Sequence, residues 1–102
     1  MSIDARVAGV CYHLSDHTTN LVLFPRDEKI GPAGQQMLTV KNEFVSDSWE
    51  RLRVLVGLEV WGGSGFLMLG DKKIADRIGY TSIRLVDGWE EIARDLIKES
   101  LK

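Results

Sequence analysis

The two histidines, the cysteine and an acidic side chain lie close together near the amino end of this chain. Cys11, His13, Asp16 and His17 are residue types that bind transition metals or activate a thiol. If residues 11–13 form a strand, Cys11 and His13 point to the same face, with Cα atoms about 6 to 7 Å apart. His17 or Asp16 could then complete a set of three ligands. This cluster defines one functional hypothesis, an enzyme or a metal-binding protein.

The spacing of the cluster argues against that hypothesis. It matches no zinc module, and a cysteine in the middle of a strand lacks the helix N-terminus or positive neighbour that lowers a thiol pKa. The sequence also contains no Gly-x-Ser-x-Gly nucleophile motif. A small buried Cys11 and two solvated histidines explain the same residues. The sequence therefore favours a protein that acts by binding, and it predicts neither a metal nor a cofactor.

A glycine-rich segment at residues 61–65 is the second candidate site. Successive glycines allow concave backbone conformations whose amide groups bind anions. An apolar strand follows the segment instead of a helix, and the lysine of a P-loop is absent, so a bulged hairpin explains the same letters. For a small anionic ligand, the predicted binding residues are Trp61, Gly62, Gly63, Ser64, Gly65, Arg77 and Arg84.

Composition limits the other classes of function. The chain is 44% hydrophobic and 27% charged, as is usual for globular proteins, which argues against disorder or a membrane span. Its net charge of −2 gives no general attraction to a phosphate backbone. The basic residues Lys72, Lys73 and Arg77 are interrupted by acids. Nucleic-acid binding would need a local basic patch, so it is disfavoured, and an oligonucleotide-binding barrel remains a further alternative.

The amino terminus and the cysteine content predict a cytoplasmic protein. The first ten residues carry an acid at Asp4 and lack a basic region followed by a sustained apolar stretch, as a secretory signal would have. A single cysteine cannot form an intrachain disulfide, and a lone thiol fits a reducing compartment.

Short apolar runs separated by turn formers predict antiparallel strands. Three strands are expected in the amino-terminal part, at residues 6–13, 21–24 and 36–41. Three or four hairpin-linked strands follow within residues 58–86. In the first strand, alternation places Ala8, Val10 and Tyr12 on the more apolar face. In the third, Thr39 and Lys41 are expected on the exposed face.

Two helices are predicted from similar starts, Asp47-Ser48-Trp49-Glu50 and Asp87-Gly88-Trp89-Glu90. Each resembles a capping box in which an acid satisfies free amide groups at the helix start. The first helix is short and ends at Gly57. The second runs to the carboxyl end with one apolar side, made of Trp89, Ile92, Ala93, Leu96 and Ile97.

These elements predict a single domain over residues 1–102, mainly β within the α+β class. We expect a small curled antiparallel sheet or barrel of about six strands, with a short middle helix and a C-terminal amphipathic helix. Oligonucleotide-binding barrels share this general order of strands around a middle helix, which is an analogy at the level of fold alone.

Two strands are apolar at every position, Leu21–Phe24 and Phe66–Leu69. Both faces of such strands need cover, and a second copy of the chain would supply it. The expected function is that of a small, cytoplasmic, non-catalytic, homo-oligomeric protein. Its expected ligand is a small anionic molecule or another protein.

Overall fold

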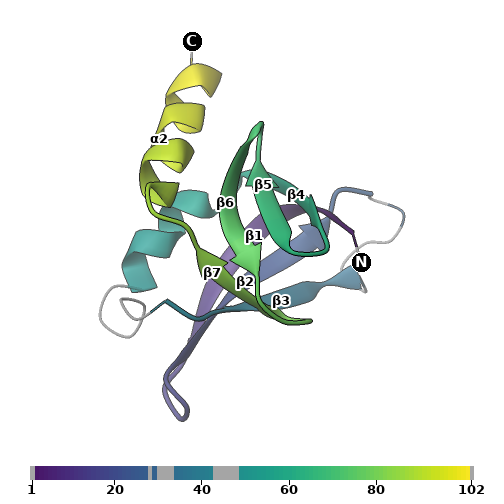
Figure 1. Cartoon of the computed structure of the whole chain (residues 1–102), viewed down its shortest axis with the longest axis vertical. Coiled ribbons are helices and arrows are strands. Elements are labelled where there is room, and N and C mark those ends of the chain that lie inside the picture. Colours follow the sequence, from purple (N-terminus) through teal and green to yellow (C-terminus); the bar gives the residue numbers. More distant parts are fainter. Residues whose placement is uncertain (1, 28, 30–33, 43–48, 102) are drawn as a thin grey trace.

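A closed barrel forms the centre of the computed structural model, which describes residues 2–27, 29, 34–42 and 49–101 (Figure 1). Within these ranges, seven strands follow one another around the barrel in the order β1-β2-β3-β7-β6-β5-β4. Their bounds are β1 Ile3–His13, β2 Thr18–Pro25, β3 Gln36–Val40, β4 Glu59–Gly63, β5 Phe66–Leu69, β6 Lys72–Arg77 and β7 Ser82–Leu85. The predicted mainly β fold with two helices is confirmed.

Two antiparallel meanders and two seams make the barrel. Strands β1 to β3 form one meander and β4 to β7 the other. One seam pairs β1 with β4 in antiparallel fashion, and the other pairs β3 with β7 in parallel. The side chain of Asn42 lengthens the parallel seam, because its Oδ1 accepts from the Leu85 amide at 2.7 Å and its Nδ2 donates to the Leu85 carbonyl at 3.0 Å. This parallel pairing adds to the antiparallel pairing predicted from sequence.

A β-bulge makes the predicted faces of β1 only partly right. The pairing with β2 shifts between Val7 and Gly9. Before the bulge Ala5 and Val7 are buried, whereas after it Val10 and Tyr12 are the half-buried residues. One extra residue reverses the alternation of faces, since side chains alternate with a period of two. Ala8, expected on the apolar face, is therefore exposed.

The middle helix η2 (Trp49–Leu55) is a 3₁₀-helix, where the sequence predicted an ordinary short helix. Three residues per turn align Leu52 with Leu55, and both are wholly buried in the hydrophobic core. Gly57 follows the helix with φ +91°, in agreement with the predicted glycine at its end. The predicted cap at Asp47 lies outside the described residues.

The C-terminal helix α2 (Trp89–Ser100) packs against β6 and η2, beside the barrel in Figure 1. Trp89 and Ala93 are buried in the core, and Ile92 and Leu96 pack against it, so the predicted apolar side is confirmed. The predicted cap at Asp87 is wrong. The N-cap is Gly88 at φ +84°, with no side-chain cap hydrogen bond, because the chain enters the helix through a left-handed turn that favours glycine.

The doubly apolar strands are partly covered by their own chain. On β2, Leu21 and Leu23 face the core, while Val22 on the other face is 9% exposed and Phe24 is 38% exposed. On β5, the outward Phe66 and Met68 are half-buried. Self-association therefore stays a prediction. Within the described ranges, no helix has the length and apolar character needed to cross a membrane.

Candidate functional site

The structure separates the members of the cysteine and histidine cluster. Cys11 is exposed, contrary to the expected small buried residue. The Tyr12 hydroxyl and His17 Nδ1 are hydrogen-bonded at 3.0 Å, which draws His17 to the face of β1 opposite Cys11 and His13. Asp16 instead accepts from the Thr18 hydroxyl at 2.8 Å, and this hydrogen bond lowers the pKa of the Asp16 carboxyl. Among the described residues, no three Cys, His, Asp or Glu side chains gather closely enough to hold a metal ion.

The glycine-rich turn between β4 and β5 meets the loop between β6 and β7, and Arg77 joins them. The Arg77 backbone amide donates to the Gly65 carbonyl at 3.0 Å. Its guanidinium donates through Nη1 to the Gly63 carbonyl at 3.2 Å and through Nη2 to the Tyr80 carbonyl at 3.0 Å. Arg77 is thus a structural link between two loops. Sequence reasoning placed it correctly beside the glycines but assigned its charge to a ligand.

A hollow of about 380 Å³ lies between these two loops, and we call it the Arg77 hollow. It is lined by Ser64, Gly65, Arg77, Ile78, Gly79 and Tyr80. Tyr80 is 76% exposed at its rim. Arg84, also predicted for the anion site, does not line this hollow; it lies opposite Asp76 in the register of β6 and β7.

Gly62 has a packing role. A Cβ atom built at Gly62 would lie 2.4 Å from the Phe66 carbonyl oxygen, closer than atoms can approach. At Gly63 the nearest atoms would be those of the Phe66 ring, at 3.4 Å. Gly62 therefore lets β4 and β5 approach each other, which accounts for one predicted site residue without a ligand.

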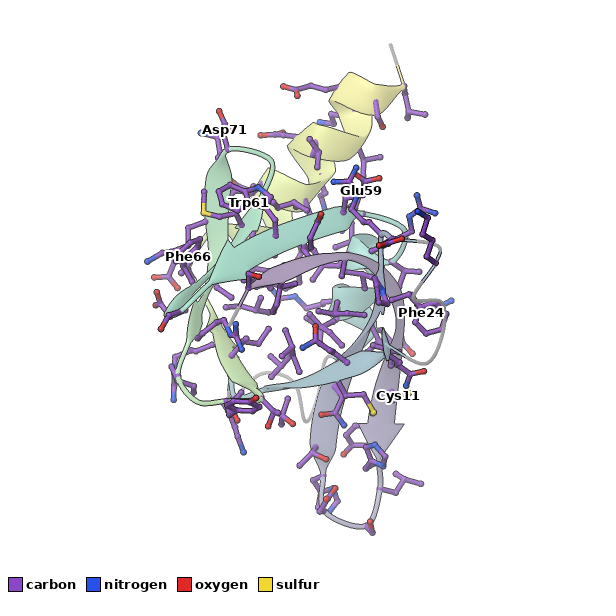
Figure 2. All side chains as sticks on the ribbon, turned by 90° about the vertical axis from the view of Figure 1, so that its right-hand side faces the viewer. Cys11, Phe24, Glu59, Trp61, Phe66 and Asp71 are labelled. Carbon is purple, nitrogen blue, oxygen red and sulfur yellow. The ribbon has the colours of Figure 1, made fainter. Side chains whose placement is uncertain are left out.

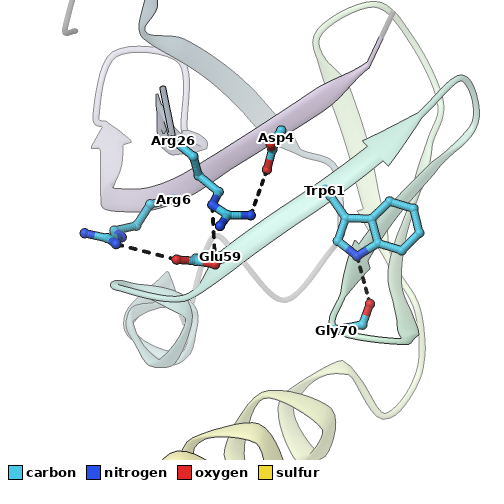
Figure 3. Close-up of polar contacts among 6 residues, drawn as sticks. All are labelled: Asp4, Arg6, Arg26, Glu59, Trp61 and Gly70. Atoms are coloured by element: carbon cyan, nitrogen blue, oxygen red, sulfur yellow. Dashed lines mark hydrogen bonds and ion pairs between the residues drawn. The ribbon is translucent and has the colours of Figure 1, made fainter. Parts of the chain in front are cut away.

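Trp61 points away from the glycine-rich turn. Its indole Nε1 donates to the Gly70 carbonyl in the β5–β6 turn at 2.8 Å (Figure 3). Its ring meets the Phe66 ring edge to face, with centroids 6.0 Å apart. Trp61 is still 45% exposed. The prediction that Trp61 shares a site with residues 63–65 is not supported, because Trp61 lines a different groove.

This second groove, which we call the Trp61 groove, has a volume of about 440 Å³. Its apolar walls are Leu58, Val60 and Trp61 from the β4 region and Leu96 from α2. Asp4, Arg26, Glu59 and Ser100 add polar groups. The groove lies where β4, the β5–β6 turn and α2 come together.

An ion-pair ridge bounds the Trp61 groove (Figure 3). Arg26 contacts Asp4 at 3.3 Å and Glu59 at 3.4 Å, and Arg6 contacts Glu59 at 3.6 Å. All four side chains are about half exposed or more, so solvent weakens these pairs. On the far side of the ridge lies the Phe24 hollow of about 320 Å³, lined by Arg6, Ala8, Phe24, Pro25, Arg26 and Glu59.

Sequence reasoning missed the residues of the Trp61 groove other than Trp61 itself. The apolar face of the last helix signalled Leu96, but nothing in the sequence specified which strand it would face. Arg26 follows a proline in a charged loop, and this pattern carries no functional signal. No protein-family model, no curated protein and no solved structure matches the chain.

Proposed function

We propose that this chain is a non-catalytic binding protein whose ligand is another protein, held in the Trp61 groove. One observation carries the proposal: a half-exposed tryptophan lines a groove of about 440 Å³ while its orientation is fixed by the Gly70 carbonyl and the Phe66 ring. Tryptophan side chains dominate the energetics of many protein interfaces, and a fixed ring loses little conformational entropy on binding.

The placement of the cations supports a protein partner over a small anion. The arginine closest to the glycine-rich turn directs two donors to backbone carbonyls. The Trp61 groove instead offers apolar area with polar groups at its margin, which is the usual composition of a protein-binding surface.

The test uses a display library of random ten-residue peptides selected on the immobilised full chain. We expect enriched peptides whose affinity, measured by fluorescence anisotropy, falls at least tenfold in Trp61→Ala. Tyr80→Ala removes an exposed aromatic ring from the other hollow and serves as the matched control, with affinity unchanged. Failure to enrich any peptide, or equal affinity for Trp61→Ala and the wild type, would overturn the proposal.

A small anion in the Arg77 hollow is the second candidate, favoured by the contact of Arg77 with the turn at residues 63–65. Inorganic phosphate and succinate are the probes, followed by amide NMR shifts. Saturable shifts at Ser64 and Gly65 would support this site. Absence of saturation up to tens of millimolar would exclude it.

The cytoplasmic, homo-oligomeric state expected from the sequence belongs to the same proposal. Native mass spectrometry tests the oligomer directly, and a clean monomer would overturn that part. The oligonucleotide-binding alternative gains little support from the last strands, since Lys73 is paired with Asp76 at 2.8 Å and Arg77 serves backbone carbonyls.

A further inference from the structure

The Trp61 groove continues at both of its ends. At one end it shares Arg26 and Glu59 with the Phe24 hollow. At the other it shares Gly70 and Leu96 with a smaller hollow of about 70 Å³ between α2 and the β5–β6 turn, which we call the α2 hollow. In Figure 2, Asp71, Trp61, Glu59 and Phe24 succeed one another across one side of the molecule. The three hollows therefore form one elongated surface.

Charge is distributed unevenly along this surface. The α2 hollow carries Asp71, Asp95 and Glu99 against a single base, Lys72. The Phe24 hollow carries Arg6 and Arg26 against Glu59. One end of the surface is thus acidic, whereas at the other end the arginines are paired with Glu59 and Asp4.

The carboxylates at the two ends also differ in their partners. Glu59 and Asp4 are engaged by arginines in the ion-pair ridge. In the described part of the chain, the carboxylates of Asp71, Asp95 and Glu99 have no hydrogen-bond or ion-pair partner. Their charge is available to a basic group from outside.

We infer that this surface binds an extended segment of a partner protein that carries apolar side chains and, at one end, lysine or arginine. The inference rests on the proposed function. The apolar side chains would occupy the Trp61 groove and the Phe24 hollow, and the basic ones would meet Asp95 and Glu99. Lysine and arginine suit the α2 end, since their aliphatic stems can lie along Ile92 and Leu96 while the charge reaches the carboxylates.

The ridge between the Trp61 groove and the Phe24 hollow specifies the middle of the segment. Arg26 and Glu59 are charged and partly exposed, so the residues that cross them should be polar or present backbone groups. An extended chain advances about 3.3 Å per residue, so ten residues reach about 33 Å, comparable to the whole molecule at 36 × 30 × 22 Å. A ten-residue probe is therefore long enough.

Other occupants fit this charge pattern less well. A nucleic acid would place phosphates against three acidic side chains at the α2 end. A second copy of the chain has a net charge of −2 and so offers no general excess of basic groups to the acidic end. A basic, partly apolar segment from a different protein complements both the apolar walls of the Trp61 groove and the acidic end.

The experiment repeats the peptide selection on two charge-reversed full chains. The groove variant, Asp95→Lys with Glu99→Lys, replaces two acids of the α2 hollow with bases. Lysines near the C-terminal end of α2 interact favourably with the helix dipole. Glu50→Lys with Asp16→Lys makes the same change in net charge at exposed positions outside the hollows. Circular dichroism establishes that both variants fold.

We expect the wild-type selection to enrich lysine and arginine at one end of the peptides. The groove variant should lose this enrichment and bind the wild-type peptides at least tenfold more weakly, whereas the control variant should keep both. Peptides that require Trp61 but bind both variants equally would overturn this inference and leave the proposed function standing. Peptides indifferent to Trp61 would overturn both. A homodimer abolished by the groove variant alone would assign the surface to a second copy and overturn the inference.

Discussion

Two arginines, Arg77 and Arg26, lie beside the two main grooves and have opposite kinds of partner. Arg77 is half-buried and donates to two backbone carbonyls, which hold two loops together. Arg26 is exposed and lies between two carboxylates on the surface. By residue type and position alone, each arginine would be described as a cation near a groove. The atoms that each guanidinium meets show that Arg77 serves the fold, while Arg26 forms part of an accessible surface.

The difference predicts unequal effects on stability. The part-buried carbonyl of Gly63 loses a charged donor when the Arg77 side chain is removed, and water replaces that donor poorly. Surface carboxylates that lose a partner are solvated at once.

Arg77→Ala should lower the free energy of unfolding by about 3 kcal/mol, because two charge-assisted hydrogen bonds between loops are lost. Urea titration measures the change. Arg84→Ala, with the same loss of charge from an exposed neighbouring strand position, should stay within about 0.5 kcal/mol. Equal losses in the two variants would contradict the structural role of Arg77.

Gly62→Ala changes the same region, on the strand that leads into the glycine-rich turn. A Cβ atom 2.4 Å from the Phe66 carbonyl forces β4 and β5 apart, so we expect a loss of about 2 kcal/mol in the same urea assay. Gly63→Ala, with its nearest contacts at 3.4 Å, should change stability by less than about 1 kcal/mol. Reversal of this order would show that the close approach at Gly62 does not constrain the turn.

Arg26→Ala should reduce the free energy of unfolding by less than about 1 kcal/mol, because both of its ion pairs are exposed. The difference from wild type should shrink further in about 1 M salt, where exposed charges are screened. A loss as large as that of Arg77→Ala would remove the contrast between the two arginines.

Glu90 has the reverse arrangement to Arg26, because its carboxylate lies between two arginines. The hydrogen bond from Arg51, at 2.9 Å, and then that from Arg94, at 3.1 Å, lower the pKa of Glu90 below its usual value of 4.5. A carboxyl whose pKa is lowered by folding stabilises the fold above its unfolded pKa and loses that contribution as pH falls through the folded value.

Glu90→Gln should therefore be less stable than wild type at neutral pH, and the two should converge in acid. Urea unfolding at a series of pH values measures this, with Glu91→Gln as the control at an exposed neighbouring position. A difference that does not vary with pH would show that the ion pairs of Glu90 contribute nothing.

Local patterns in the sequence predicted most of the elements. Alternating and continuous apolar runs located the strands, and the apolar side of the last helix located Trp89 and Ala93 in the core. The errors came from single residues with special geometry. One extra residue near Ala8 reversed the faces of β1, and a left-handed Gly88 replaced the expected cap at Asp87.

The candidate sites were predicted less well because they depend on pairing between distant segments. The ridge exists because β1 and β4 pair with Arg6 opposite Glu59 and Asp4 opposite Trp61. No local pattern in the sequence predicts that register. Residues 63–65 lie near Arg77 because short hairpins join their strands, and this proximity could be predicted. The carbonyl groups that Arg77 contacts depend on the conformation of the folded loops, which the sequence pattern does not specify.

The two seams of the barrel also have a consequence for how the chain folds. Within each meander, neighbouring strands are linked by hairpins, so their pairing needs little loop closure. The parallel seam joins positions such as Asn42 and Leu85, which are 43 residues apart. Contacts between distant positions slow folding. We expect the two halves of the barrel to form early and the two seams, β1 with β4 and β3 with β7, to close in the last, slowest step.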